Sequence, residues 1–279
     1  MNWFENRELL IATQHGKEKA IAPLLEQAFS LRCSLPKAFD SDQFGTFSGE
    51  IERTFSAHET ARLKGREAAR IASSDLVLSS EGSFGSHPQL YFLPLNTELI
   101  LLQDFKNKFE ILVSESTTET NYAAAEIASE NDLFKFAERI GFPEHAIILK
   151  NCAKGFAACI KGIHTAEELR AGFHSISAQF GAVYAETDMR AMHNPMRMQA
   201  IKKACEKLVV RMQSCCAQCG LPGFGVISFT PGLPCSWCNE PTQLPMKRVL
   251  SCAHCEHSVH EAINSDKGAD PMHCFRCNP

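Results

Sequence analysis

Short apolar runs alternate with helical patterns along the N-terminal part of the chain. The short runs predict buried strands, because strands covered on both faces of a sheet are continuously apolar; they lie at residues 8–13, 75–80, 146–150 and 183–185. Apolar residues repeat at helical spacing elsewhere, which predicts helices at 21–28, 58–72 and 165–179. Residues 98–104 and 109–115 flank a short polar turn and predict a hairpin. This alternation indicates an α/β fold.

Helix boundaries follow from residue type. Pro23 disfavours a helix interior, so the first helix should become regular near Ile21. Residues 122–139 read as helix-rich, and Asn194 before Pro195 predicts a capped helix that runs to Gln213. We therefore expect an N-terminal mixed sheet with flanking helices over residues 1–194, a connecting helix over 195–213, and a small β-rich double zinc ribbon over 214–279.

The C-terminal part carries four Cys-x-x-Cys pairs. A Cys-x-x-Cys turn aims two thiolates at one point, and two such turns complete a tetrahedral zinc site. The pairs are Cys216/Cys219, Cys235/Cys238, Cys252/Cys255 and Cys274/Cys277. They predict two closed, structural Zn²⁺ sites without a position for a catalytic water; redox dithiols or a disulfide scaffold are the alternative.

How the four pairs combine is open from the sequence. Each spacer is long enough for a β-hairpin, so sequential pairing, first with second and third with fourth, is the simplest expectation. The spacing is equally compatible with nested or crossed pairing. Four histidines crowd this region and, with eight thiols available, are expected to be bystanders: His254, His257, His260 and His273.

Composition and charge exclude some classes of protein. Hydrophobic residues make up 44% of the sequence, yet no apolar run is long enough to cross a bilayer. The N-terminus lacks the pattern of a signal peptide, so a cytoplasmic protein without a membrane partner is expected. The net charge is −4. Residues 201–279 hold 8 Lys+Arg and 6 Asp+Glu, hence +2, and eight thiolates with two Zn²⁺ change this to −2. This charge disfavours a purely nucleic-acid-binding ribbon.

The turn between the first strand and the first helix is a candidate phosphate site. It contains His15, Gly16 and Lys17, and a strand that leads through a glycine turn into a helix favours an anion at the helix N-terminus. An ordinary turn with a solvated lysine is the alternative. A second glycine-containing segment, 81–88, is predicted to be a loop at the end of a buried strand, where open α/β sheets place their sites. Glu81 in this loop and Glu59 at a helix start are candidate catalytic carboxylates that would meet around Mg²⁺, and Ser83 is a candidate phosphate-binding residue.

A second polar cluster precedes the long C-terminal helix. It comprises Asp188, Arg190, His193 and Arg197. These side chains have the chemistry to bind a phosphate or a nucleobase, and equally that of an internal polar network.

Two resemblances arise from these motifs. The segments 12–17, 80–85 and 187–190, with the Cys pairs, resemble a bacterial family known only as a domain of unknown function. Residues 8–115 remotely resemble the inosine-triphosphate pyrophosphatase and Maf-like fold. This second resemblance implies that Lys17 and Lys64 contact phosphates, that Glu59 and Glu81 bind Mg²⁺ or activate water, and that Phe84 lies near a base.

Two hypotheses of function follow. The first is a Mg²⁺-dependent nucleotide pyrophosphatase, or a related phosphate-ester hydrolase, with a structural zinc module. The second is a non-enzymatic sensor or adaptor that binds a nucleotide or another phosphorylated small molecule and docks a protein or RNA partner through its ribbon. The oligomeric state is not encoded in any recognisable pattern.

Overall fold

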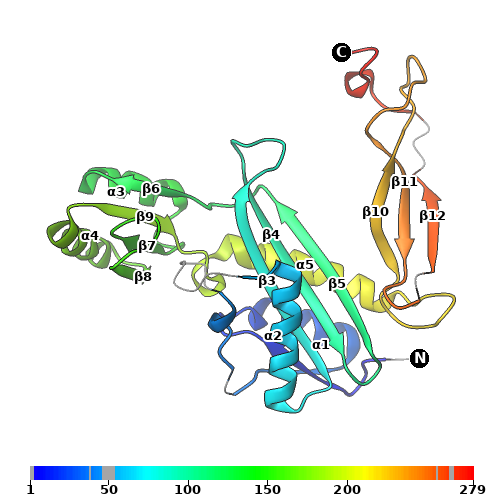
Figure 1. Ribbon diagram of the computed structural model, residues 1–279, viewed down its shortest axis with the longest axis horizontal. Coiled ribbons are helices and arrows are strands. Elements are labelled where there is room, and N and C mark those ends of the chain that lie inside the picture. Colours follow the sequence, from blue (N-terminus) through cyan, green and yellow to red (C-terminus); the bar gives the residue numbers. More distant parts are fainter. Residues whose placement is uncertain (1–2, 38, 46–53, 256, 264–266) are drawn as a thin grey trace. The chain divides into compact units, whose positions relative to one another are not determined.

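The chain divides into two compact units. The computed structural model describes residues 3–37, 39–45, 54–255, 257–263 and 267–279 (Figure 1). The α/β unit comprises Met1–Lys108 and Leu112–Val209, and the ribbon unit comprises Phe109–Ile111 and Val210–Pro279. The two units differ in the interactions that stabilise each of them.

A mixed five-stranded sheet forms the centre of the α/β unit, in the order β2-β1-β3-β4-β5. Its strands are β1 (Glu8–Ala12), β2 (Arg32–Ser34), β3 (Leu76–Ser86), β4 (Pro94–Asp104) and β5 (Phe109–Thr117), of which Phe109–Ile111 belong to the ribbon unit. β1 pairs in parallel with β2 and β3, whereas β3 and β4 form a long antiparallel hairpin. The predicted mixed sheet with flanking helices and a C-terminal Cys-rich module is confirmed.

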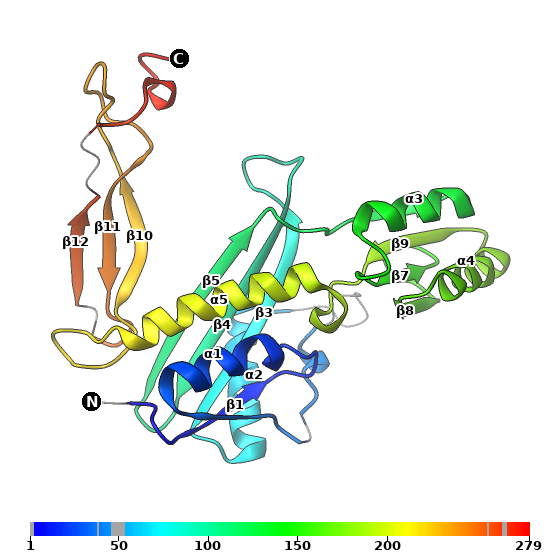
Figure 2. The same ribbon diagram turned by 180° about the vertical axis from the view of Figure 1, so that it is seen from behind.

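Three helices cover this sheet: α1 (Glu18–Phe29), α2 (Ala57–Ala72) and α5 (Pro195–Gln213). α2 lies on one face, while α1 and α5 lie on the other (Figures 1 and 2). Leu10 and Ala12 of β1 share a buried cluster with Ala68 of α2. α1 begins at Glu18 and contains Pro23, so the expected start near Ile21 is wrong. Its apolar face, with Ile21 and Leu25 fully buried, stabilises the helix despite the hydrogen bond that proline cannot donate.

The α/β unit contains a second sheet of four strands in the order β6-β9-β7-β8. The strands are β6 (Ala124–Ile127), β7 (Ile147–Lys150), β8 (Cys159–Ile163) and β9 (Val183–Thr187). α3 (Glu130–Ile140) and α4 (Ala166–Phe180) pack against it and share one apolar core that includes Leu133, Leu149 and Leu169. The expectation of a helix over 122–139 is wrong at its start. There Ala124–Ile127 pairs with β9, and this pairing overrides the helix propensity of Ala and Glu.

Side-chain caps start the helices as their sequences predict. Ser56 and Thr165 form capping boxes with Glu59 and Glu168 at the starts of α2 and α4. The side chain of Asn194 accepts a hydrogen bond from the N–H of Arg197 at 2.9 Å, which caps α5. Short 3₁₀ turns lie at Asp42–Phe44, Ala191–His193 and Pro271–His273. Among the described residues no helix combines the length and apolar character that a membrane span requires.

The ribbon unit is an antiparallel three-stranded meander of β10 (Gly225–Pro231), β11 (Pro245–Ser251) and β12 (Ser258–Ala262). Within the described part of residues 214–279, the buried apolar side chains are those of Pro222, Ala269 and four zinc-site cysteines, Cys216, Cys235, Cys252 and Cys274. No apolar core of the kind seen in the α/β unit is present in this part of the chain. The clustered cysteines are therefore the main candidates for what holds the meander together.

Candidate ligand site and metal centres

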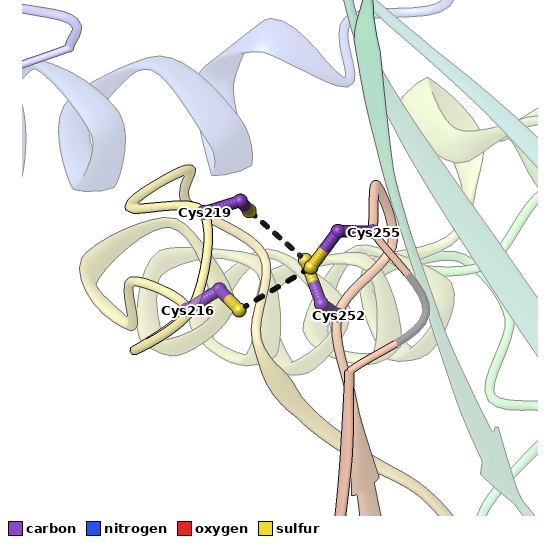
Figure 3. A group of neighbouring side chains, drawn as sticks. All are labelled: Cys216, Cys219, Cys252 and Cys255. Carbon is purple, nitrogen blue, oxygen red and sulfur yellow. Dashed lines mark hydrogen bonds between the residues drawn. The ribbon is translucent and has the colours of Figure 1, made fainter.

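Two groups of four cysteines are assembled in the ribbon unit. The first zinc site is Cys216, Cys219, Cys252 and Cys255 (Figure 3), and the second zinc site is Cys235, Cys238, Cys274 and Cys277. Within each group all Sγ atoms lie within 4.8 Å of one another. The shortest contacts across the knuckles are 3.5–3.9 Å. A tetrahedron with Zn–S of about 2.3 Å requires sulfur separations of about 3.8 Å, so both groups fit Zn²⁺.

The expected sequential pairing is wrong, because the first Cys-x-x-Cys turn joins the third and the second joins the fourth. Each spacer holds a single strand rather than a hairpin. In an antiparallel meander the start of β10, the end of β11 and the start of β12 meet at one end of the sheet, and the other strand ends meet at the opposite end. Successive turns therefore fall at alternate ends, and alternate turns pair.

Backbone amides support the thiolates. The N–H of Gln218 donates to Cys216 Sγ and that of His254 to Cys252 Sγ, each at 3.4 Å. A backbone hydrogen bond from Cys219 lowers the pKa of Cys216 to about 7, and one from Cys277 does the same for Cys274. Donors aimed at sulfur favour the deprotonated form, which is the form that binds metal. Four thiolates would fill the coordination sphere of a bound Zn²⁺, which is the arrangement typical of structural zinc sites.

In the α/β unit, the predicted phosphate turn contains a buried lysine. Lys17 immediately precedes α1 and is 5% exposed. Its ammonium donates to Ser80 Oγ at 3.0 Å and to the Ser80 carbonyl at 3.4 Å. Among the residues that the structure describes, it makes no other hydrogen bond and has no carboxylate at ion-pair distance. Desolvation lowers the pKa of Lys17 to about 7, and the charge of Arg197 acts in the same direction.

Lys64 and Glu81 form a buried ion pair on the opposite face of the sheet. Side chains alternate along β3, so Ser80 and Gly82 face α1 and α5, whereas Glu81 faces α2 and pairs with its Lys64. Lys17 and Lys64 are therefore separated by the sheet, although both charges of the pair act electrostatically on Lys17. Lys17 and Lys64 therefore do not share one surface. The Lys64–Glu81 pair influences Lys17 only through its charges.

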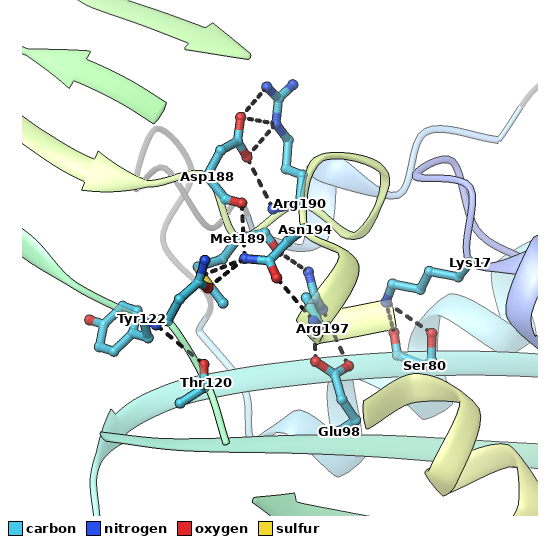
Figure 4. Close-up of polar contacts among 11 residues, drawn as sticks. Lys17, Ser80, Glu98, Thr120, Tyr122, Asp188, Met189, Arg190, Asn194 and Arg197 are labelled. Atoms are coloured by element: carbon cyan, nitrogen blue, oxygen red, sulfur yellow. Dashed lines mark hydrogen bonds and ion pairs between the residues drawn. The ribbon is translucent and has the colours of Figure 1, made fainter. Parts of the chain in front are cut away.

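Arg197 is the most deeply buried cation of the predicted second cluster. It is 1% exposed, and its Nε donates to Glu98 Oε1 on β4 at 2.7 Å (Figure 4). Its guanidinium also donates to the Met189 carbonyl and lies 5.3 Å from the ring centre of Phe84. Gly82 leaves room for this pair: a Cβ there would lie 2.4 Å from Arg197 Nη2. Arg197 thus fastens α5 to the sheet.

The other members of that cluster order the turn between β9 and α5. Asp188 holds Arg190 through two side-chain contacts of 2.6 and 3.0 Å and accepts from the N–H of Gly162 at 3.1 Å. His193 Nδ1 lies 2.8 Å from His164 Nε2. Burial lowers the pKa of His193, which favours the neutral form of this imidazole. The cluster is an internal network whose outer members are Arg190 and His193.

The two predicted polar segments lie side by side. A Cβ on Gly16 would stand 3.6 Å from Cβ of Met192, and the charge of His15 acts on the pKa of His193. The turn before α1 and the turn before α5 therefore adjoin. They bring His15 and Lys17 to the same region as His193. In the sequence these two turns are separate candidates for binding a phosphate.

The carboxylates do not form a magnesium site. Glu59 is exposed, and its carboxylate accepts hydrogen bonds from the Ser56 N–H and hydroxyl, which lower its pKa. Glu81 is paired with Lys64 and Glu98 with Arg197. Within the described chain, the only groups of three or more metal-ligand side chains are the two cysteine clusters. Glu59 and Glu81 are thus engaged by different partners, Ser56 and Lys64, and no described group of three or more ligands includes either of them.

The predicted loop at 81–88 is also wrong over most of its length, because β3 continues to Ser86. Ser83 is therefore half-buried and pairs with Thr97 of β4. It lies within the β-sheet and not in a phosphate-binding loop. Phe84 stacks on Tyr122 with ring centres 5.6 Å apart. The sequence-based prediction missed Ser80, Glu98 and His164. An acid at the start of the apolar run of the predicted strand at 98–104 was the available signal for Glu98.

Comparison with known proteins places the chain in a family without assigning an activity. No curated protein matches it. Among solved structures, it is similar to protein VC0702 from Vibrio cholerae, with 9% identity, a TM-score of 0.27, and coverage of 73% of this chain and 96% of that one. The model of a domain of unknown function, DUF6671, matches residues 64–279. The chain belongs to the DUF6671 family.

Proposed function

We propose that the α/β unit binds a phosphorylated small molecule where the turn before α1 meets the turn before α5. The observation that supports this most directly is Lys17. A buried ammonium normally pairs with a carboxylate, because its desolvation is costly. Lys17 instead has only the neutral oxygens of Ser80 in the described structure. An anionic guest would supply the missing charge.

The surroundings favour an anion over a cation. Lys17 precedes the first residue of α1, whose N–H groups and dipole attract negative charge. The charges that act on Lys17 are those of Lys64, Arg197, Glu81 and Glu98. Together with Lys17 itself they sum to +1 when all five groups are ionised. Both acids already have cationic partners. The uncompensated charge is thus positive and belongs to Lys17.

Calorimetric titration with inorganic phosphate, pyrophosphate and a panel of nucleotides tests this proposal. We expect saturable binding that Lys17→Met weakens at least about tenfold, the equivalent of one lost charged contact. Lys19→Met on the exposed side of α1 is the matched control and should bind normally. Equal affinity in the two variants, or binding of none of the probes, would reject the site.

The pH dependence provides a second measurement that does not need a variant. The free protein holds Lys17 with a pKa near 7. A bound anion favours the protonated amine, so binding takes up a proton above that pH. Affinity should therefore fall as pH rises from about 7 to about 9. An affinity that stays constant over this interval contradicts a role for Lys17.

Hydrolysis of the bound ligand, as by a Mg²⁺-dependent nucleotide pyrophosphatase, is the second candidate function. It is favoured by Glu98, a buried carboxylate on the same face of the sheet as Lys17, because its charge acts on Lys17. Turnover of a nucleotide panel, with and without added Mg²⁺ or Mn²⁺, distinguishes it from binding alone. Activity that disappears in Glu98→Gln, in protein that retains its fold, supports the hydrolase. Binding without turnover supports a sensor.

A further inference from the structure

The two zinc sites differ in the side chains that their knuckles expose. At the second zinc site Trp237 and Phe275 are 78% and 73% exposed, and Met272 nearby is 64% exposed. At the first zinc site the corresponding positions between the cysteines are small or polar: Ala217, Gln218, Ala253 and His254. Large aromatic side chains are thus displayed at only one of the two sites.

The aromatic side chains are carried by both knuckles of that one site. Trp237 directly precedes Cys238 and Phe275 directly follows Cys274, and the two Sγ atoms are 3.5 Å apart. Metal ligation would fix both backbones, so the rings would lose little conformational entropy on binding a partner. Neither ring is needed for an apolar core, since both are largely exposed to solvent. Exposed aromatic clusters of this kind are typical of recognition surfaces.

Charge decides what kind of partner fits. Residues 210–279 contain 5 Lys+Arg and 5 Asp+Glu, so their side chains sum to zero before metal. Eight thiolates and two Zn²⁺ add −4. Two of the cations are already paired, Arg276 with Glu240 and Arg248 with Glu261. A polyanion such as RNA would be repelled, whereas a cationic side chain would be attracted to the zinc–thiolate centre and to the faces of the rings.

We propose that Trp237 and Phe275 at the second zinc site form a docking surface for a lysine- or arginine-bearing protein segment. The cationic side chain lies over an aromatic ring, and apolar side chains of the same segment contact the remaining aromatic surface and Met272. This surface is independent of the ligand site in the α/β unit. It assigns to the ribbon unit a role in recognition that structural zinc alone does not provide.

Tryptophan fluorescence offers a direct test, because the chain contains only Trp3 and Trp237. In a Trp3→Phe full-length chain loaded with zinc, Trp237 is the sole reporter. We would titrate a ten-residue peptide of alternating Lys and Leu, the same peptide with Glu in place of Lys, and a ten-residue oligothymidylate. A saturable blue shift with the Lys peptide alone is expected.

Phe275→Ala should weaken the Lys peptide about tenfold, as for a residue at the centre of an interface. His254→Ala at the first zinc site is the matched control and should leave affinity unchanged. Zinc content, measured in every variant, verifies that the ribbon is loaded. Equal binding of the Glu peptide, preferential binding of the oligothymidylate, no saturable change, or the same affinity in Phe275→Ala would each overturn the proposal.

Discussion

The α/β unit and the ribbon unit differ in the interactions that stabilise them. The α/β unit buries apolar side chains on both sheets and fastens α5 with the fully buried Arg197–Glu98 pair. The described part of residues 214–279 buries no Leu, Ile, Val, Met or Phe side chain, and gathers its cysteines at the two ends of a thin sheet. One unit depends on burial, and the other has two cysteine clusters that fit Zn²⁺ in place of an apolar core. The two should therefore fail under different perturbations.

Loss of a zinc ligand should produce the largest effect. Cys238→Ser removes one ligand of the second zinc site, and structural Zn²⁺ contributes on the order of 10 kcal/mol to the folding of small modules. We expect bound zinc to fall from two ions to one per chain, with loss of ordered NMR signals from that end of the ribbon and none from the α/β unit. Cys215→Ser is the control, because Cys215 is exposed and belongs to neither site. Parallel loss of both units would refute the comparison.

Breaking the buried ion pair should act on the α/β unit alone. Arg197→Leu leaves Glu98 buried without its partner, which costs about 3–5 kcal/mol. Urea unfolding should show an earlier transition for this unit and normal zinc retention. The double variant Arg197→Leu/Glu98→Leu should recover part of the loss, and Lys203→Ala, which breaks an exposed pair, should have no measurable effect. Zinc release by Arg197→Leu would show that the units are not independent.

Filling the space beside that pair tests the same interaction through packing. A Cβ at position 82 would lie 2.4 Å from Arg197 Nη2 and 2.9 Å from Glu98 Oε1. Gly82→Ala should cost about 3 kcal/mol, since a well-packed interior accommodates an added methyl group only by distortion. Gly85→Ala on the same strand meets nothing within 4 Å and should be near neutral. Comparable unfolding curves for the two variants would contradict the close approach.

The smallest expected effect is the pH dependence due to Lys17. The folded chain holds this amine with a pKa near 7, below its ordinary value of 10.5. Above pH 7 the unfolded state therefore binds more protons, so stability rises with pH, and the charged lysine is most costly below pH 7. Relative to Lys17→Met, the free energy of unfolding of the wild type should increase by roughly 2 kcal/mol between about pH 7 and about pH 9. A constant difference means that the amine is not desolvated in solution.

Much of the fold was predictable because local signals and tertiary contacts agree. The predicted cap at Asn194 is present, and the local Ser-x-x-Glu and Thr-x-x-Glu patterns at Ser56 and Thr165 form capping boxes. The eight zinc-site cysteines are likewise evident, because a Cys-x-x-Cys turn is a local geometry. The start of the region 122–139 failed, since only pairing with β9 makes Ala124–Ile127 a strand.

The candidate site was predictable in its parts but not in its arrangement. His15, Lys17 and His193 were selected as polar residues in turns, and nothing local shows that the two turns adjoin. The assignment of Glu81 to a loop depended on Gly82 and Gly85, which are typical of loops. In the structure Gly82 instead makes room for Arg197 inside a strand, a requirement set by a residue more than a hundred positions away.

The interleaved cysteine pairs have a consequence for how the ribbon is assembled. Cys219 contacts Cys252, which lies 33 residues later, and Cys238 contacts Cys274, which lies 36 residues later. The stretch of chain that spans one zinc site therefore overlaps the stretch that spans the other. A chain that ends between residues 256 and 273 would contain the complete first zinc site and only one Cys-x-x-Cys pair of the second. Trimming the ribbon from either end therefore leaves one unpartnered Cys-x-x-Cys turn beside the single complete site, and during synthesis the first zinc site is completed before the second.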